Sequence, residues 1–323
     1  MIANSGEYRK KNGQRGYVMM NNFIFENKTK VYFGKGGVKE YLGGLLANSG
    51  ETIMLAYGGG SIKCNGVYDE IMGILNAQGK CVVEFSGIMS NPTYAKVQDG
   101  AKLARENHVD LILTAGGGSV SDCCKVISGA FDTLSHAMET YFGKPDENNL
   151  SDDINEAVMR SVIRNIRILL TDPENYDARS ELAQASAMAE NGVLKIGKVT
   201  DFQAHQIHHQ LGAYTDCNHG AGLSVIHPVL YRHIYKSGAA RFARFAQNVW
   251  GIAPRDSDEE TAAAGIDALA AFIKEIGLLT TFTELGIPAD TDFRAVADST
   301  NVTAGCCKKL TRDEICEILQ ECL

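Results

Sequence analysis

The stretch DLILTAGGGSVSDCCKVISGAFDTLSHAMETYF, residues 110–142, decides the fold of this chain. It begins as a short apolar run typical of a buried strand, passes three glycines and then continues as one long helical pattern. Later segments, such as SDDINEAVMRSVIRNIRILL (151–170) and AARFARFAQNVWGI (239–252), carry apolar residues at helical spacing. We therefore expect an α/β region before this stretch and an all-helical region after it.

The region before residue 110 alternates β-rich runs with helical patterns. The β-rich runs are KVYFGKG (30–36), TIMLAYGGG (52–60) and CVVEFSGI (81–88), and NPTYAKVQDGAKLARENH (91–108) is helical in pattern. Such alternation predicts a parallel sheet covered by helices. With residues 110–118 the sheet has about four strands, which is few for such a fold. The predicted organisation is a disordered extension (1–19), a truncated α/β dinucleotide-binding domain (20–130) and a helical metal-binding domain (131–323).

Composition and charge restrict the class of protein. The chain has 323 residues, 45% of them hydrophobic, which is enough for a sizeable core and suggests two domains. A net charge of -8 disfavours a nucleic-acid or anionic membrane partner, so we expect a small-molecule partner. The nine cysteines form no CxxC pair, and no run has the length of a membrane span or of a secretory signal. These features predict a cytoplasmic protein.

Two glycine turns, YGGGS (57–61) and AGGGS (115–119), follow predicted strands. Glycine lets the backbone approach a phosphate closely, and the helix start beyond it offers N–H donors. One such turn is weak evidence, because glycines also close ordinary strand-to-helix connections, but two in one sheet favour a dinucleotide. Gly59, Gly60 and Ser61 offer no carboxylate for the ribose hydroxyls, which favours NADP over NAD unless a more distant acid reaches in.

The histidines suggest a metal site. Asp132 and His136 are four residues apart, so on a helix they share one face, and His205 and His209 repeat that spacing. His219 follows a predicted turn. One oxygen ligand with three imidazoles suits Fe(II) or Zn(II) and would leave an open position for substrate, and the lack of nearby thiolates argues against a closed structural zinc site.

The competing interpretation is that each histidine is an ordinary hydrogen-bonded core residue. For a single D-x-x-x-H pair that interpretation is the better one, but the repeated spacing favours the metal site. The other histidines are assigned no function: His108, His208, His227 and His233.

Taken together, these stretches resemble the iron-containing (group III) alcohol dehydrogenase family, particularly its butanol dehydrogenase-like members. The matching stretches are FENKTKVYFGKG, YGGGSIKCNGVYDE, GIMSNPTYAKVQDGAKLARE, AGGGSVSDCCK, FDTLSHAMETYF, AHQIHHQLGAYTDCNHGAGL and FAQNVWGI. They extend over nearly all of the chain from Met20 onward. The resemblance implies a metal-dependent, NAD(P)-linked alcohol dehydrogenase or aldehyde reductase that assembles as a homodimer. Hydride would pass between nicotinamide and a primary alcohol or aldehyde whose oxygen is polarised by the metal.

Carried over position by position, the resemblance implies roles for individual residues. The implied metal ligands are the set that the spacing indicates, namely Asp132, His136, His205 and His219. His209 corresponds to a histidine near the nicotinamide and would carry a proton. The cofactor pyrophosphate would lie against Gly116, Gly117, Gly118 and Ser119, with Asp122 close by. The adenosine ribose would face Gly58, Gly59, Gly60 and Ser61.

The sequence departs from the family pattern at two places. Ser90 stands where the family has a proline. A longer difference lies between Ala130 and Phe131, where the family carries a segment with further strands and a TGSE-like stretch that contacts the cofactor. Two alternatives therefore stay open. One is a truncated, non-catalytic paralogue that retains metal binding, and the other is a relative of glycerol dehydrogenase or dehydroquinate synthase, whose metal sites use fewer histidines.

Overall fold

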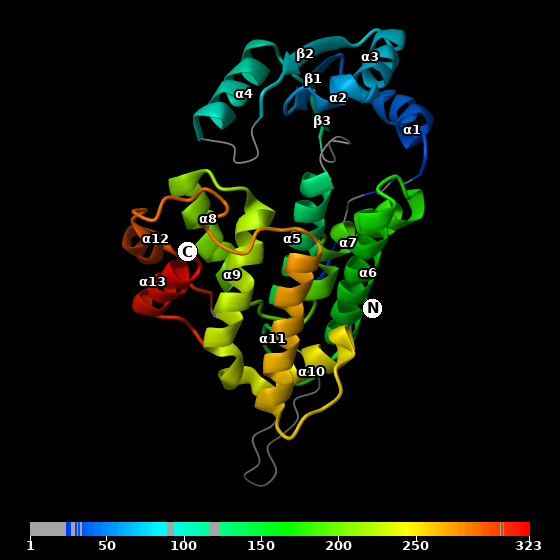
Figure 1. The fold of residues 1–323 in the computed structure, drawn as a ribbon. Coiled ribbons are helices and arrows are strands. Elements are labelled where there is room, and N and C mark those ends of the chain that lie inside the picture. Colours follow the sequence, from blue (N-terminus) through cyan, green and yellow to red (C-terminus); the bar gives the residue numbers. More distant parts are fainter. Residues whose placement is uncertain are drawn as a thin grey trace.

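A computed structural model describes residues 24–26, 30, 32, 34–88, 94–116, 123–303, 305 and 307–323. The predicted disordered extension (1–19) and Ser90 lie outside these residues. Figure 1 shows a small α/β layer above a larger helical bundle, with β3 pointing toward the amino end of α5. No helix in the described part of the chain combines the length and the apolar character needed to cross a membrane.

The α/β part is built around a parallel sheet with strand order β2-β1-β3. β1 lies in the middle, where Leu55 pairs with Glu84 on one side and with Leu113 on the other. Its residues are almost all buried, as expected for a central parallel strand with covered faces. The elements are α1 (Gly37–Leu46), β1 (Thr52–Tyr57), α2 (Ser61–Cys64), α3 (Val67–Ala77), β2 (Cys81–Phe85), α4 (Tyr94–Glu106) and β3 (Leu111–Ala115).

The first predicted strand, KVYFGKG, is wrong for the residues that the structure describes. Lys30 and Tyr32 are irregular, and residues 34–36 form a bend and turn that lead into α1. Gly34 and Gly36 have φ angles of 153° and 76°, which are not strand conformations. The described part of the sheet therefore has three strands.

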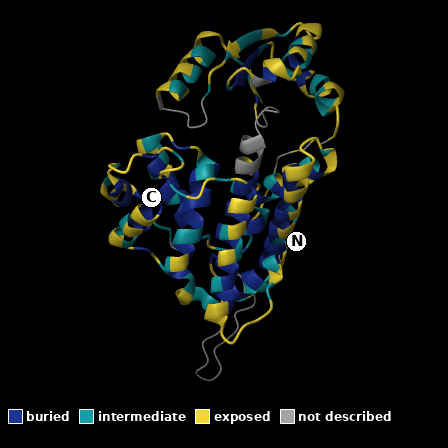
Figure 2. Cartoon of the chain, in the orientation of Figure 1, coloured by how far each residue is buried: buried dark blue, intermediate teal, exposed yellow. Residues whose placement is uncertain are grey.

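The helical part begins with α5 and has its own hydrophobic core. Figure 2 shows buried residues concentrated inside the bundle, and the core of the bundle shares no residue with the core around β1. α5 runs without a break through the predicted domain boundary at Ala130. The elements are α5 (Cys123–Tyr141), α6 (Leu150–Thr171), α7 (Tyr176–Glu190), η1 (Val193–Lys195), α8 (Gln203–Thr215), α9 (His219–Ile234), η2 (Tyr235–Gly238), α10 (Ala239–Trp250), α11 (Asp258–Glu275), α12 (Phe293–Ser299) and α13 (Arg312–Glu321). This order confirms the predicted fold class.

A buried ion-pair network joins α6, α10 and the loop between η1 and α8. Asp152 closes the capping box at the start of α6 by accepting the Asn149 N–H at 3.1 Å. The same carboxylate pairs with the ammonium group of Lys198 and, at 2.7 Å, with Nη1 of Arg241. The two cations lie in the interior of the bundle, and Asp152 is the carboxylate that pairs with both, so the folded state depends on it.

Replacing Asp152→Ala leaves Lys198 and Arg241 buried without their anion. We expect the free energy of unfolding, measured with urea, to fall by about 3–5 kcal/mol. The matched control is Asp153→Ala, because Asp153 is 65% exposed and pairs with Arg244 at the surface. That change should cost less than about 1 kcal/mol. Similar losses in the two variants would contradict the role of Asp152 as the anion of this buried network.

Candidate metal centre and nucleotide turns

The bundle brings the four predicted ligands together from three helices. Asp132 and His136 lie one turn apart on α5, His205 lies in the first turn of α8, and His219 is the first residue of α9. Asn218 caps α9 by accepting the Ala221 N–H at 3.1 Å, which fixes where that helix begins. One helix face and two helix starts thus place the side chains.

Asp132 Oδ1 is the centre of this group. It is buried and has no hydrogen-bond partner among the described residues. Nε2 atoms surround it at 3.5 Å from His205, 3.6 Å from His219 and 3.8 Å from His136. Ligand atoms about 2.1 Å from one tetrahedral ion lie about 3.4 Å apart. The spacing and the unpaired acceptor therefore fit a single bound cation.

The group is tighter around some members than others. Ligand atoms of Asp132, His205 and His219 all lie within 4.8 Å of one another. The Nε2 atoms of His136 and His205 are 3.0 Å apart, and His136 Nε2 is also 2.9 Å from Glu190 Oε1. His136 thus contacts both the group and a half-exposed carboxylate beside it.

The electrostatics of the group favour a positive charge at its centre. Burial lowers the pKa of His219 to about 4, so this imidazole is neutral at neutral pH and has a lone pair to donate. Burial also opposes the charged form of His205, but the carboxylates of Glu139 and Asp132 prevail and raise its pKa to about 9. Against the effect of burial, the imidazoles led by His205 lower the pKa of Asp132. Two carboxylates thus act on one buried ring.

His209, the predicted proton carrier, lies at the exposed edge of the group. Its ring stacks on that of His219, with centroids 5.4 Å apart and an interplanar angle of 16°. Partial burial and then the neighbouring His205 lower the pKa of His209. A neutral, exposed imidazole beside the cluster can accept a proton and pass it to solvent. The assignment remains a prediction.

His208, to which the sequence analysis assigns no function, lies against the site. Its buried ring turns toward His219, and the two Nδ1 atoms are 2.9 Å apart. The ring fits because residue 222 is glycine: a Cβ there would lie 2.3 Å from His208 Nε2. The contact depends on α8 packing against α9, which spacing along one helix could not indicate.

The other unassigned histidines have ordinary partners or positions. His227 is buried and lies 2.6 Å from the hydroxyl of Ser135, and His233 pairs with Glu321 at 3.1 Å. His108 is exposed at the end of α4.

Glu139 is a site residue that the sequence analysis missed. It is completely buried, and its carboxylate contacts the ring of His205 and accepts the Ala204 N–H at 2.6 Å. A signal was present, because Asp132, His136 and Glu139 follow the i, i+4, i+7 pattern that puts residues on one helix face.

The glycine turns lie at the carboxyl ends of neighbouring strands. Gly58, Gly59 and Gly60 follow β1, and Gly116 follows β3. Added Cβ atoms at Gly59, Gly60 and Gly116 would meet nothing within 4 Å, so these backbones are open to a ligand. The chain moves from β1 to β2 on one side and then to β3 on the other, which makes the β1/β3 junction a topological switch point.

Four predicted nucleotide contacts lie outside the described residues. They are Gly117, Gly118, Ser119 and Asp122. Ser61 begins α2, and its side chain also lies outside the description.

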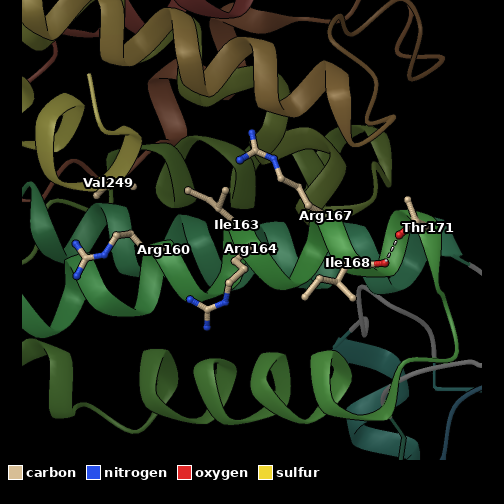
Figure 3. Close-up of a pocket in the computed structure, with 7 residues that line it drawn as sticks. All are labelled: Arg160, Ile163, Arg164, Arg167, Ile168, Thr171 and Val249. Carbon is tan, nitrogen blue, oxygen red and sulfur yellow. Dashed lines mark hydrogen bonds between the residues drawn. The ribbon is translucent and has the colours of Figure 1, made fainter. Parts of the chain in front are cut away.

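A surface groove of about 500 Å³ lies elsewhere, along α6, and contains none of the predicted site residues (Figure 3). In that view Arg167 and Arg164 point to opposite sides of the helix. Arg167 is held by Glu275 through two 2.8 Å hydrogen bonds, and Arg160 donates to the Asn248 carbonyl at 2.8 Å. Arg160 and Arg167 thus connect α6 with α10 and α11.

The glycine beside His208 provides a test of this packing. Gly222→Ala places a methyl group against the buried His208 ring, and we expect a loss of about 1–3 kcal/mol in the free energy of unfolding of the metal-free protein. Gly212→Ala is the matched control, because its Cβ would meet the same ring at an ordinary 3.5 Å. Alanine should raise helix stability there by up to about 1 kcal/mol. Urea unfolding measures both changes, and equal effects would refute the close packing at Gly222.

Comparison with known proteins gives consistent matches over most of the chain. It is 29% identical to the probable NADH-dependent butanol dehydrogenase 2 of Bacillus subtilis over 392 residues, covering 94% of this chain and all of that protein. It is 25% identical to the NADPH-dependent aldehyde reductase YqhD of Escherichia coli over 356 residues, covering 83% and 90%. The crystal structure of NADH-dependent butanol dehydrogenase A from Thermotoga maritima has the same fold, with a TM-score of 0.86, 24% identity and coverage of 94% and 99%.

The Bacillus alignment is longer than this 323-residue chain, so that relative contains residues without a counterpart here. Two family models match. The model for iron-containing alcohol dehydrogenase matches residues 28–157, and the model for the C-terminal part of the Fe-containing alcohol dehydrogenase family matches residues 126–323. The second match alone includes more than half of the chain, with Asp132 and the three histidines around its unpaired oxygen. The chain therefore belongs to the iron-containing alcohol dehydrogenase family.

Proposed function

We propose that this chain is a metal-dependent, NAD(P)-linked alcohol dehydrogenase or aldehyde reductase of the butanol dehydrogenase type. The observation that carries the proposal is the buried Asp132 oxygen with three imidazole nitrogens 3.5–3.8 Å away, in a chain of this family. The relatives' names supply the reaction class and suggest primary alcohols and aldehydes as substrates.

Asp132, His136, His205 and His219 would hold the metal, Fe(II) or Zn(II). One carboxylate oxygen and three nitrogens, without sulfur, suit either ion. The ion would supply Lewis acidity toward the substrate oxygen, and nicotinamide would supply or accept the hydride. The side chains of Asp132 and His219 are about 30% exposed, whereas His205 is buried, so substrate would approach on their side. His209, beside His219, would exchange the proton with solvent.

The nicotinamide cofactor would bind at the β1/β3 junction, against Gly58–Ser61 and the turn that begins at Gly116. Glu84, near the end of β2, is the type of residue that holds ribose hydroxyls in NAD enzymes. Its carboxylate already accepts from the hydroxyls of Tyr57 and Tyr68 at 2.5 and 2.7 Å, and Lys63 lies 3.7 Å away. Because the Glu84 carboxylate is already engaged by these side chains and does not stand free for the ribose hydroxyls, we favour NADP, with NAD as the alternative.

A non-catalytic protein that binds metal alone is the second candidate. It is favoured by the residues of the Bacillus relative that have no counterpart here, because a shortened α/β domain can lose its cofactor. The cytoplasmic location and the homodimer implied by the resemblance complete the proposal for an enzyme.

The decisive assay combines metal content, cofactor binding and turnover. Protein loaded with Fe(II) or Zn(II) should bind NADPH, as measured by a change in NADPH fluorescence. In the presence of butyraldehyde it should oxidise the bound NADPH. Asp132→Asn should lower activity more than about 100-fold. Mutating a residue that only hydrogen-bonds to a metal ligand already lowers metal affinity or activity by about 10- to 100-fold.

Asp216→Asn is the matched control, since Asp216 ends α8 and has no place in the ligand set. It should retain both metal and activity. Metal uptake without NADPH or NADH binding would refute the enzyme and support the non-catalytic candidate.

A further inference from the structure

Glu139 is a buried carboxylate that the proposed mechanism leaves without a role. It lies one turn beyond His136 on the helix face that carries Asp132, and its relative exposure is 0%. An ionised carboxylate is costly to bury unless it has close partners. Within the described part of the chain, Glu139 forms an ion pair with His205. This pairing connects Glu139 directly to the proposed metal ligands.

The Glu139 carboxylate also serves the start of α8. The first N–H groups of a helix lack partners within the helix, and the N-cap residue Phe202 supplies no side-chain acceptor. Glu139 Oε1 accepts the Ala204 N–H at 2.6 Å, and Oε2 accepts the backbone N–H of His205 at 3.4 Å. A negative charge at the positive end of the helix is also favourable. The carboxylate is thereby fixed by backbone atoms.

The third contact sets the chemistry of His205. Its Nδ1 meets Glu139 Oε2, while its Nε2 points the other way, 3.5 Å from Asp132 Oδ1. An ionised carboxylate can only accept, so Nδ1 must carry the proton. In the neutral ring Nε2 then carries the lone pair. His205 is held with its ligating nitrogen directed into the cluster.

We propose that Glu139 is the positioning residue that fixes the tautomer and ring orientation of His205 for metal binding. The inference rests on the metal site of the proposed function. Carboxylates that accept the second ring N–H of a metal-bound histidine raise its basicity and restrict its orientation. Here the same carboxylate also ties that orientation to the start of α8.

Glu139→Gln is the informative variant because it keeps size and shape but adds an N–H₂ donor. A glutamine that donates to Nδ1 favours the wrong tautomer, with the proton on Nε2. We expect Zn(II) affinity, measured by chelator competition, to fall 10- to 100-fold. Glu139→Asp keeps the charge but is one methylene shorter. It should lose Zn(II) affinity as well, which would show that the carboxylate must reach His205 and that charge alone is not enough.

The matched control is Glu156→Gln. Glu156 is also a nearly buried carboxylate, but it binds Tyr141, Arg244 and Asn248 away from the cluster. This variant should lose stability and keep its Zn(II) affinity. An equal drop in Zn(II) affinity in Glu139→Gln and Glu156→Gln would indicate a general effect of buried charge and overturn the positioning role of Glu139.

A spectroscopic readout reports the tautomer directly, beginning with the unsubstituted protein. In the Zn(II)-loaded protein, long-range ¹H–¹⁵N correlation should show His205 protonated at Nδ1, with slow proton exchange. In Glu139→Gln the exchange should become fast or the tautomer change. Unaltered affinity and exchange in that variant would overturn the role of Glu139 alone. Failure of the unsubstituted protein to bind Zn(II) would overturn both this inference and the proposed metal site.

Discussion

A buried carboxylate oxygen surrounded by imidazoles places a strong constraint on this bundle. Asp132 Oδ1 faces imidazole nitrogens from α5, α8 and α9. The carboxylates of Glu139 and Asp132 raise the pKa of His205 to about 9, which favours a positive charge on this ring in the metal-free protein. Bringing these groups together orders the starts of α8 and α9 against one face of α5. The packing of the bundle and the chemistry of the site therefore depend on the same few contacts.

α5 also links the two halves of the molecule. It follows β3 and the turn that begins at Gly116 in sequence, and its buried residues from Ala130 onward belong to the core of the bundle. The open glycine backbones lie at the β1/β3 switch point, and Asp132 and His136 on α5 follow Ser119 by 13 and 17 residues. A cofactor at the sheet and a cation on α5 would thus be joined by one short stretch of chain, while the two hydrophobic cores remain separate.

Spacing along single helices predicted the ligands that share a face or begin a helix. Asp132 and His136 follow from the four-residue interval, His205 from the same interval to His209, and His219 from its place after a predicted turn. His208 could not be found in this way, because its contact with His219 needs α9 to approach closely at Gly222. Glu139 could have been found from its own helix face. The strand predicted from the first β-rich run is wrong. Its residue types favour a strand, but Gly34 and Gly36 adopt φ angles that a strand does not have.

The central claim is that one divalent ion binds to one carboxylate and three imidazoles. X-ray absorption at the zinc edge of the Zn(II)-loaded protein tests it most directly. The account predicts a first shell of nitrogen and oxygen at about 2.0–2.2 Å, with the outer-shell scattering of imidazole rings. A sulfur shell at about 2.3 Å, or a shell without imidazole scattering, would contradict it.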